Sequence, residues 1–244
     1  MFIIGVTIFI PGEKLKIKKS DLLRIFKNQI FYILLIIGVL ILHLIEVNFI
    51  EPHLPLNDYT SIIRDFEGEI VFSFSQYWTA PLLYFFVIIY IGIYPFTLWF
   101  SPFYFLITGN KKAMKTFSYG LILIYIVTLP FYLFIPVTNV FTYYNIQSPL
   151  EIVILSVENF FYSTTTRNNC LPSLHTALTI LIAYSTSLTG NKKISYFTYF
   201  IAITVIISVI YLSIHWITDV ITGIVLSFGV IIILKKTIKE FKNE

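Results

Sequence analysis

Charge is scarce in this sequence: Lys, Arg, Asp and Glu together make up 12% of its 244 residues. Soluble domains carry about 25% charged residues, so this chain has too few to cover a water-facing surface. Hydrophobic residues instead make up 57% of the chain, and its mean hydropathy is +0.83. The composition excludes an ordinary soluble domain and indicates an all-α integral-membrane protein.

Cysteine and basic patches are also in short supply. Cys170 is the single cysteine, which excludes an internal disulfide. The net charge is +4, but the lysines are scattered between apolar runs and form no basic face. We therefore expect no nucleic-acid partner.

Long apolar runs are what the sequence has in abundance. A helix needs about 20 apolar residues to cross the hydrocarbon core of a bilayer. Six runs qualify, and they are roughly Gln29–Ile45, Ala80–Ile107, Phe117–Ile135, Leu171–Leu188, Ile194–Leu212 and His215–Leu234. The sequence predicts a six-helix transmembrane bundle at 30–234, preceded by a cytoplasmic or interfacial segment at 1–29 and followed by a basic cytoplasmic tail at 235–244.

Two local features of these runs carry expectations. The second run is long and contains Pro95, so we expect a kink there or a break near Ser101. The last run follows the fifth closely, and Ser213 is predicted to cap its first turn.

The basic residues predict the orientation of the bundle. With both termini in the cytoplasm, all of the 17 Lys and Arg residues except Arg64 and Arg167 fall on the inner side. This division follows the positive-inside rule. We therefore expect a multi-pass protein of the cell membrane. All four histidines lie on the side that is nearly free of lysine, so any chemistry is expected at the extracytoplasmic face.

The first candidate motif is Pro172-Ser173-Leu174-His175, at the start of the fourth run. Pro172 suits the first position of a helix, where its missing N–H costs nothing. The following N–H groups, including those of Ser173 and Leu174, would then point out of the helix and bind an anion such as phosphate. Arg167 could add a positively charged guanidinium, whose parallel N–H donors suit a phosphate. The same residues fit a plain helix start about equally well.

The second candidate motif is His215-x-x-x-Asp219, at the start of the sixth run. Residues four apart in a helix share one face, so the Asp219 carboxylate can fix the tautomer of His215. The other imidazole nitrogen would then be free as a base or nucleophile. A structural histidine–aspartate hydrogen bond is the alternative, which the cost of an intramembrane aspartate makes less favourable. A zinc site ranks low, because no HExxH pattern or clustered third ligand is present.

Taken together, the two motifs resemble the type-2 phosphatidic acid phosphatase superfamily, which includes the vanadium haloperoxidases. The order and spacing of Pro172-Ser173-x-His175 and His215-x-x-x-Asp219 carry the resemblance, which covers about Leu121 to Leu226. The family's basic first motif is missing, as is the arginine expected before the second histidine, where Ser208-Val209 stands. Pro-Ser-Leu-His without that arginine is more similar to the inositolphosphotransferase-like branch.

The resemblance implies a role for each motif residue. His215 would attack phosphorus and form a phosphohistidine, and Asp219 would orient and stabilise it. His175 would protonate the leaving oxygen and then activate the acceptor, which is water or a hydroxyl. Ser173 and the N–H of Leu174 would hold the phosphoryl oxygens.

With the family's basic residues missing, Arg167 is the preferred substitute as a phosphate ligand. The resemblance implies no metal and no cofactor, and it implies a lipid phosphate as substrate among membrane lipids. The expected function is that of a lipid-phosphate phosphatase or phosphotransferase, acting on a phosphatidate-like or polyprenyl phosphate or diphosphate. The alternatives are a lipid headgroup transferase and a lipid-binding relative without catalysis. A transporter fits less well, because the polar residues gather at one face.

Overall fold

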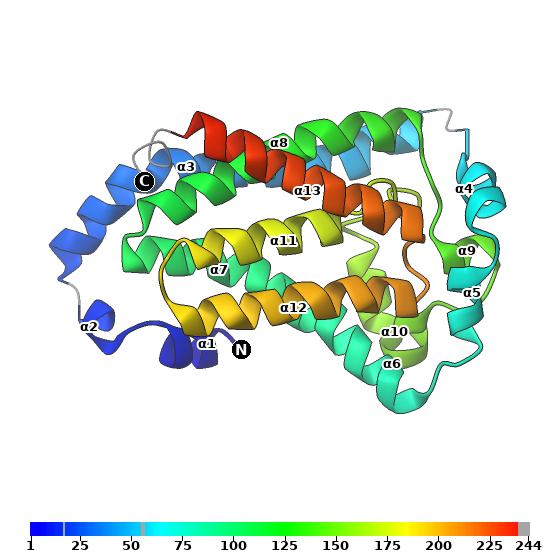
Figure 1. Cartoon of the computed structure of the whole chain (residues 1–244), viewed down its shortest axis with the longest axis horizontal. Coiled ribbons are helices and arrows are strands. Elements are labelled where there is room, and N and C mark those ends of the chain that lie inside the picture. The colour runs from blue at the N-terminus through cyan, green and yellow to red at the C-terminus, as the bar shows by residue number, and fades with distance from the viewer. Residues whose placement is uncertain (17, 55–56, 239–244) are drawn as a thin grey trace.

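The chain folds into an elongated bundle of helices, seen from the side in Figure 1. The structure is a computed structural model and describes residues 1–16, 18–54 and 57–238. Its helices are α1 (Phe2–Phe9), α2 (Gly12–Leu15), α3 (Lys19–Ile45), η1 (Glu46–Ile50), η2 (Glu51–His53), α4 (Thr60–Glu67), α5 (Ile70–Ser75), α6 (Ala80–Val87), η3 (Ile88–Ile93), α7 (Tyr94–Thr108), α8 (Lys111–Phe134), α9 (Val140–Tyr143), α10 (Pro149–Phe161), α11 (Leu174–Ser187), α12 (Lys192–Tyr211) and α13 (Ile217–Thr237). The described residues form no strands, so the predicted all-α class is confirmed.

Five helical stretches are long and apolar enough to cross a membrane, as in a multi-pass membrane protein. They are Ser20–His53, Ala80–Thr108, Lys111–Phe134, Lys192–Tyr211 and Ile217–Thr237. Each overlaps one of the predicted runs, although the first extends at both ends beyond the predicted Gln29–Ile45.

The remaining predicted run contains α11, which has 14 residues and is about 21 Å long. It packs against α7, α8, α12 and α13, and nine of its residues are buried. Its N-terminal end stops short of the adjoining ends of α12 and α13 (Figure 1). This helix is therefore at the centre of the bundle, and Leu174 and His175 of its first turn line a cavity.

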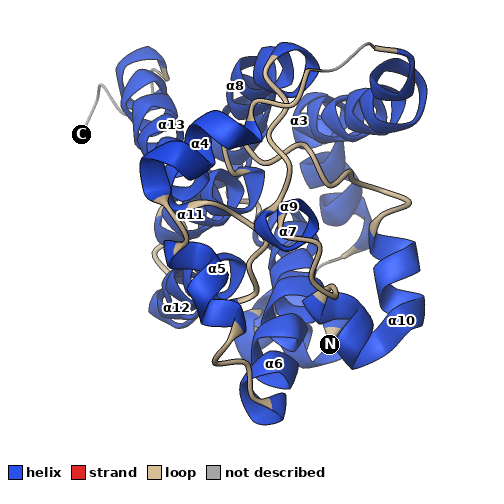
Figure 2. Ribbon diagram, turned by 90° about the vertical axis from the view of Figure 1, so that its right-hand side faces the viewer, coloured by secondary structure: helices blue, strands red, loops and turns tan. Residues whose placement is uncertain are grey.

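Short helices cover the end of the bundle at which α11 begins. Figure 2 shows α4, α5, α9 and α10 lying across this end. They belong to the two longest connections, between α3 and α6 and between α8 and α11. At the opposite end the N-terminal helix α1 packs on α7, where the Phe2 ring meets Phe100 edge-on with the ring centres 5.4 Å apart.

Three local predictions need correction. The break expected near Ser101 is absent, because α7 continues through this residue, and directly before Pro95 the backbone forms the π-helical turn η3. The fourth run becomes helical at Leu174, so Pro172 lies before the helix and Ser173 is its N-cap. Trp216, not Ser213, caps α13.

Candidate active site

The start of α11 is held in place by hydrogen bonds on both sides of Ser173. The Ser173 hydroxyl oxygen accepts from the N–H of Thr176 at 3.3 Å, which is the usual bond of an N-cap. The Ser173 N–H itself donates to the carbonyl oxygen of Asp219 at 2.9 Å. Because these N–H groups are already bonded, at most those of Leu174 and His175 remain at this helix start to bind an anion.

His215 and Asp219 meet at the start of α13, although His215 lies in the turn before the helix and not on it. His215 Nδ1 is 3.3 Å from Asp219 Oδ2, and the same oxygen accepts from the N–H of Trp216 at 2.9 Å. Both side chains are buried. Because a carboxylate oxygen only accepts, this contact places the proton of the neutral imidazole on Nδ1 and leaves Nε2 with a free lone pair.

The structure brings His175 to that free nitrogen. His175 Nδ1 is 3.5 Å from His215 Nε2, although 40 residues separate the two in the chain. Aromatic rings hold the His175 imidazole: the centroid of Tyr90 lies 4.7 Å away and that of Tyr94 lies 5.2 Å away. Asp219, His215 and His175 thus form a continuous line of contacts.

Close packing between α11 and α13 fixes the relative positions of His175, His215 and Asp219. A Cβ atom added at Gly223 would lie 2.7 Å from the carbonyl oxygen of Ser173, so only glycine allows the two backbones to come this near. Glu67 on α4 accepts from the N–H of Ile217 at 2.9 Å and also from that of Thr218, which satisfies the free first turn of α13. Glu67 was not found from the sequence, because nothing near it marks it as a partner for a helix 150 residues later.

Arg167 is placed near the site by its backbone, but its guanidinium is engaged elsewhere. Its Nη2 is 3.1 Å from a carboxylate oxygen of the buried Glu158 on α10, and its charge lies 4.8 Å from the ring centre of Tyr162. A phosphate would therefore have to compete with Glu158 for this arginine.

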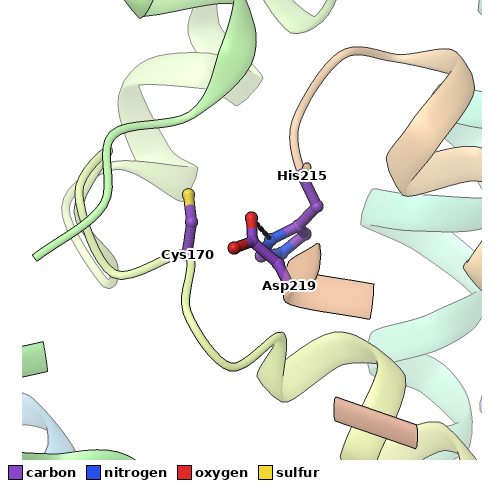
Figure 3. Close-up of side chains that lie close together, drawn as sticks. All are labelled: Cys170, His215 and Asp219. Carbon is purple, nitrogen blue, oxygen red and sulfur yellow. Dashed lines mark hydrogen bonds and ion pairs between the residues drawn. The ribbon is translucent and has the colours of Figure 1, made fainter. Parts of the chain in front are cut away.

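Cys170 makes a three-residue group with His215 and Asp219, in which one ligand-type atom from each lies within 4.8 Å of the others. Figure 3 shows the Asp219 carboxylate between the Cys170 thiol and the His215 ring. Burial raises the pKa of the Cys170 thiol well above its usual value, and the negative charge of Asp219 raises it further. A thiol ligates metals as the thiolate, so these surroundings disfavour metal binding at neutral pH.

A cavity of about 480 Å³ begins at His175 and extends between α3, α7 and α8. Its size is that of a typical small-molecule site. Most of its wall is apolar, with Leu121 and Leu178 among its lining residues, while His43 and Asn169 lie on its polar portion. The site therefore combines an imidazole pair, in which His215 is buried and His175 is partly exposed, with space for an apolar chain.

Comparisons with known proteins agree with this arrangement. A family model described as PAP2 superfamily matches residues 82–242. "Uncharacterized protein MJ0662" of Methanocaldococcus jannaschii is 31% identical over 92 residues, which cover 36% of this chain and 38% of that protein. The match thus spans well under half of that relative's length, and no solved structure matches. Since the family model covers more than half of the chain, including both motifs, the protein belongs to the PAP2 superfamily.

Proposed function

We propose that the protein is a membrane enzyme that cleaves the phosphoester of a lipid phosphate through a phosphohistidine on His215. The observation that carries the proposal is the line Asp219–His215–His175, with the Nε2 lone pair of His215 directed at His175. A nucleophile oriented by a carboxylate and paired with an acid–base group is the arrangement that covalent catalysis needs.

The reaction takes place in two balanced steps. His175 acts in its protonated, imidazolium form. His215 Nε2 attacks phosphorus as the bond from phosphorus to the lipid oxygen breaks, and that oxygen takes the Nδ1 proton of His175, which becomes neutral. An acceptor oxygen then attacks the phosphohistidine, its proton passes to His175, and the electron pair of the P–N bond returns to His215. Throughout both steps Asp219 accepts a hydrogen bond from the Nδ1–H of His215, and its carboxylate stabilises the positive charge that develops on the imidazole.

The proposed setting is the one that the charges predict: six spans including α11, both termini in the cytoplasm, and the site at the extracytoplasmic face. The cavity beside His175 supports a lipid substrate, because a chain lying there would place its phosphate at the imidazole pair. Ser173, the N–H of Leu174 and Arg167 are proposed to hold the phosphoryl oxygens. Chemistry on the two histidines needs no metal.

The test is phosphate release from phosphatidate by purified protein in detergent that contains a chelator. His175→Ala and His215→Ala should each reduce turnover at least about 10²-fold, the scale of a lost acid–base group. His53→Ala, a change of an exposed histidine in η2, is the matched control and should leave turnover unchanged. Full activity in either site variant would sink the proposal.

Transfer of a phosphoryl headgroup to another molecule is the second candidate, and the loss of the family's basic motifs favours it. It needs the same histidines and differs only in the acceptor. A lipid-binding relative without catalysis is the remaining alternative. Vanadate separates this last case from the others: thermal protection by vanadate that is lost in His215→Ala favours an enzyme site, whereas an absence of protection favours a binding protein.

A further inference from the structure

The cavity at the imidazole pair is closed on the side of α8 and open on another side, as the exposure of its lining residues shows. On α8 the lining residues are buried, and Phe117 and Leu121 are 1% and 8% exposed. On the facing helices, Leu44 of α3 is 36% exposed and Trp99 of α7 is 47% exposed, although both also line the cavity. A residue that lines a cavity and is also exposed on the surface marks a place where the cavity opens. The opening therefore lies between α3 and α7, and we call it the side opening.

The side opening is closed at the end where α7 finishes. A Cβ atom added at Gly109, the C-cap of α7, would lie 3.8 Å from Cδ1 of Ile25 on α3, so the two helices meet there. Elsewhere around the cavity α3 packs on α8, α8 packs on α11, and α11 packs on α7. The side opening is thus a gap in the wall between α3 and α7, above the point at which these helices touch.

The surroundings of the side opening are apolar. Leu44 belongs to the helical stretch Ser20–His53 and Trp99 to the stretch Ala80–Thr108, and both stretches are long and apolar enough to cross a membrane. In a bilayer such helices are surrounded by lipid chains. Drawing an acyl chain out into water costs free energy for every methylene group, and a chain that enters sideways avoids this cost. The side opening therefore suits a ligand that comes from the membrane.

The height of the side opening matches an upright lipid. Leu44 follows His43, which lies on the polar portion of the cavity. Trp99 lies five residues after Tyr94, whose ring centre is 5.2 Å from that of His175. Five residues of helix rise about 7.5 Å, so the opening extends from the level of the imidazole pair along the apolar part of the cavity. A lipid standing in it would have its phosphate near His175 and its chain beside Trp99.

We propose that the lipid phosphate enters the cavity from the bilayer through the side opening, between Leu44 and Trp99. This inference rests on the proposed function, to which it adds the class of the substrate: an amphiphile taken directly from the membrane, and not a phosphoester taken from water. The family model begins at residue 82, so α3 lies outside the matched part of the chain. One side of this entrance is therefore built by residues that the family match does not include.

The experiment attaches a bulky group at the side opening and compares the same protein before and after attachment. Leu44→Cys and Trp99→Cys are each alkylated with N-pyrenylmaleimide in detergent. Phosphate release is then measured from dioleoyl phosphatidate and from the water-soluble dibutyryl phosphatidate. Alkylation should lower kcat/KM for the dioleoyl lipid at least about tenfold, the scale of an overpacked contact. It should leave kcat/KM for the dibutyryl lipid unchanged, because that substrate can approach from water.

Two proteins serve as controls. Ile41→Cys places the same label on α3 at a residue that is 51% exposed and does not line the cavity. Alkylation there should leave the turnover of both lipids unchanged. The unsubstituted protein controls for the native Cys170, which is buried.

The outcomes separate the entry route from the reaction. Complete alkylation of both variants, verified by mass, without loss of dioleoyl turnover overturns the side entry and leaves the proposed function standing. An equal loss for the two lipids, or an equal loss in the Ile41→Cys control, also overturns the side entry, because the label then acts by another means. Hydrolysis of neither lipid by the unmodified protein overturns the proposed function, and the side entry falls with it.

Discussion

The two nitrogens of His215 have different surroundings, and this difference determines which nitrogen carries the proton and which is available to react. Nδ1 faces the buried carboxylate of Asp219, and Nε2 faces His175. In the absence of substrate the His175 N–H can donate to Nε2 and cover its lone pair. In the proposed reaction an incoming phosphate replaces this contact, so the imidazole that first covers the Nε2 lone pair of His215 is then in place to protonate the leaving group.

Arg167 carries the residue-scale prediction. Arg167→Ala should lower kcat about 10²-fold, the usual cost of losing one donor to a developing anion, as measured by phosphate release from phosphatidate. Glu158→Gln should instead lower the KM for the lipid phosphate, because it removes the carboxylate that competes for the guanidinium. Arg167→Lys keeps the positive charge but lacks the paired N–H donors of the guanidinium, so it separates the effect of charge from that of two-point hydrogen bonding. Unchanged kinetics in Arg167→Ala would remove this residue from the site.

At this scale the sequence predicted more of the chemistry than of the geometry. Motif spacing was sufficient to select His175, His215 and Asp219, and the structure places the three side chains together. The sequence motifs did not predict that the Ser173 N–H donates to the carbonyl oxygen of Asp219, or that Arg167 pairs with Glu158. Asp219 lies far from Ser173 in the chain, and Glu158 belongs to a different element from Arg167, so the local pattern around either residue does not indicate its partner.

At the scale of the helix pair, the contact of α11 with α13 is the element on which the site depends. Gly223→Ala should lower the unfolding free energy by about 1–3 kcal/mol, the usual cost of overpacking, because the new Cβ meets backbone and not a flexible side chain. It should also reduce turnover, since Ser173 and Asp219 are displaced together. Thermal unfolding in detergent and phosphate release measure the two effects.

Gly229→Ala is the control for that change, on the same helix. A Cβ at Gly229 meets nothing within 4 Å, so alanine there should be neutral or gain up to about 1 kcal/mol in helix propensity. Equal stability of the two variants would show that the backbones of α11 and α13 can separate freely.

Hydrophobic run length predicted the existence of the helices well and their beginnings poorly. The Ala80–Thr108 stretch occupies its predicted run almost residue for residue. α11 begins at Leu174, two residues after the predicted first position Pro172, because Ser173 occupies the N-cap. The start of α13 depends on Asp219, whose carboxylate caps Trp216 while it orients His215, and a double use of this kind has no separate signal in the sequence.

On the scale of the whole molecule, the predicted orientation can be tested with single cysteines. Asp65→Cys on α4 should react with a membrane-impermeant maleimide added to intact cells, whereas Lys192→Cys should react only after the membrane is opened. Both positions are exposed. The native Cys170 should contribute little background, because its thiol is buried and its pKa is raised. Labelling of Lys192→Cys in intact cells, with Asp65→Cys protected, would reverse the orientation.

Because α11 is short, the thickness of the surrounding membrane should affect how easily a lipid phosphate reaches His175. A hydrocarbon core is about 30 Å thick, whereas α11 is about 21 Å long. Because α11 is enclosed by α7, α8, α12 and α13, a lipid that enters between these helices must lower its phosphate below the headgroup plane to reach the level of His175. Bilayers with short acyl chains bring the headgroup plane to the imidazoles, and thick bilayers hold it away. If the proposed reaction takes place at His175, we expect its turnover to fall as the membrane becomes thicker.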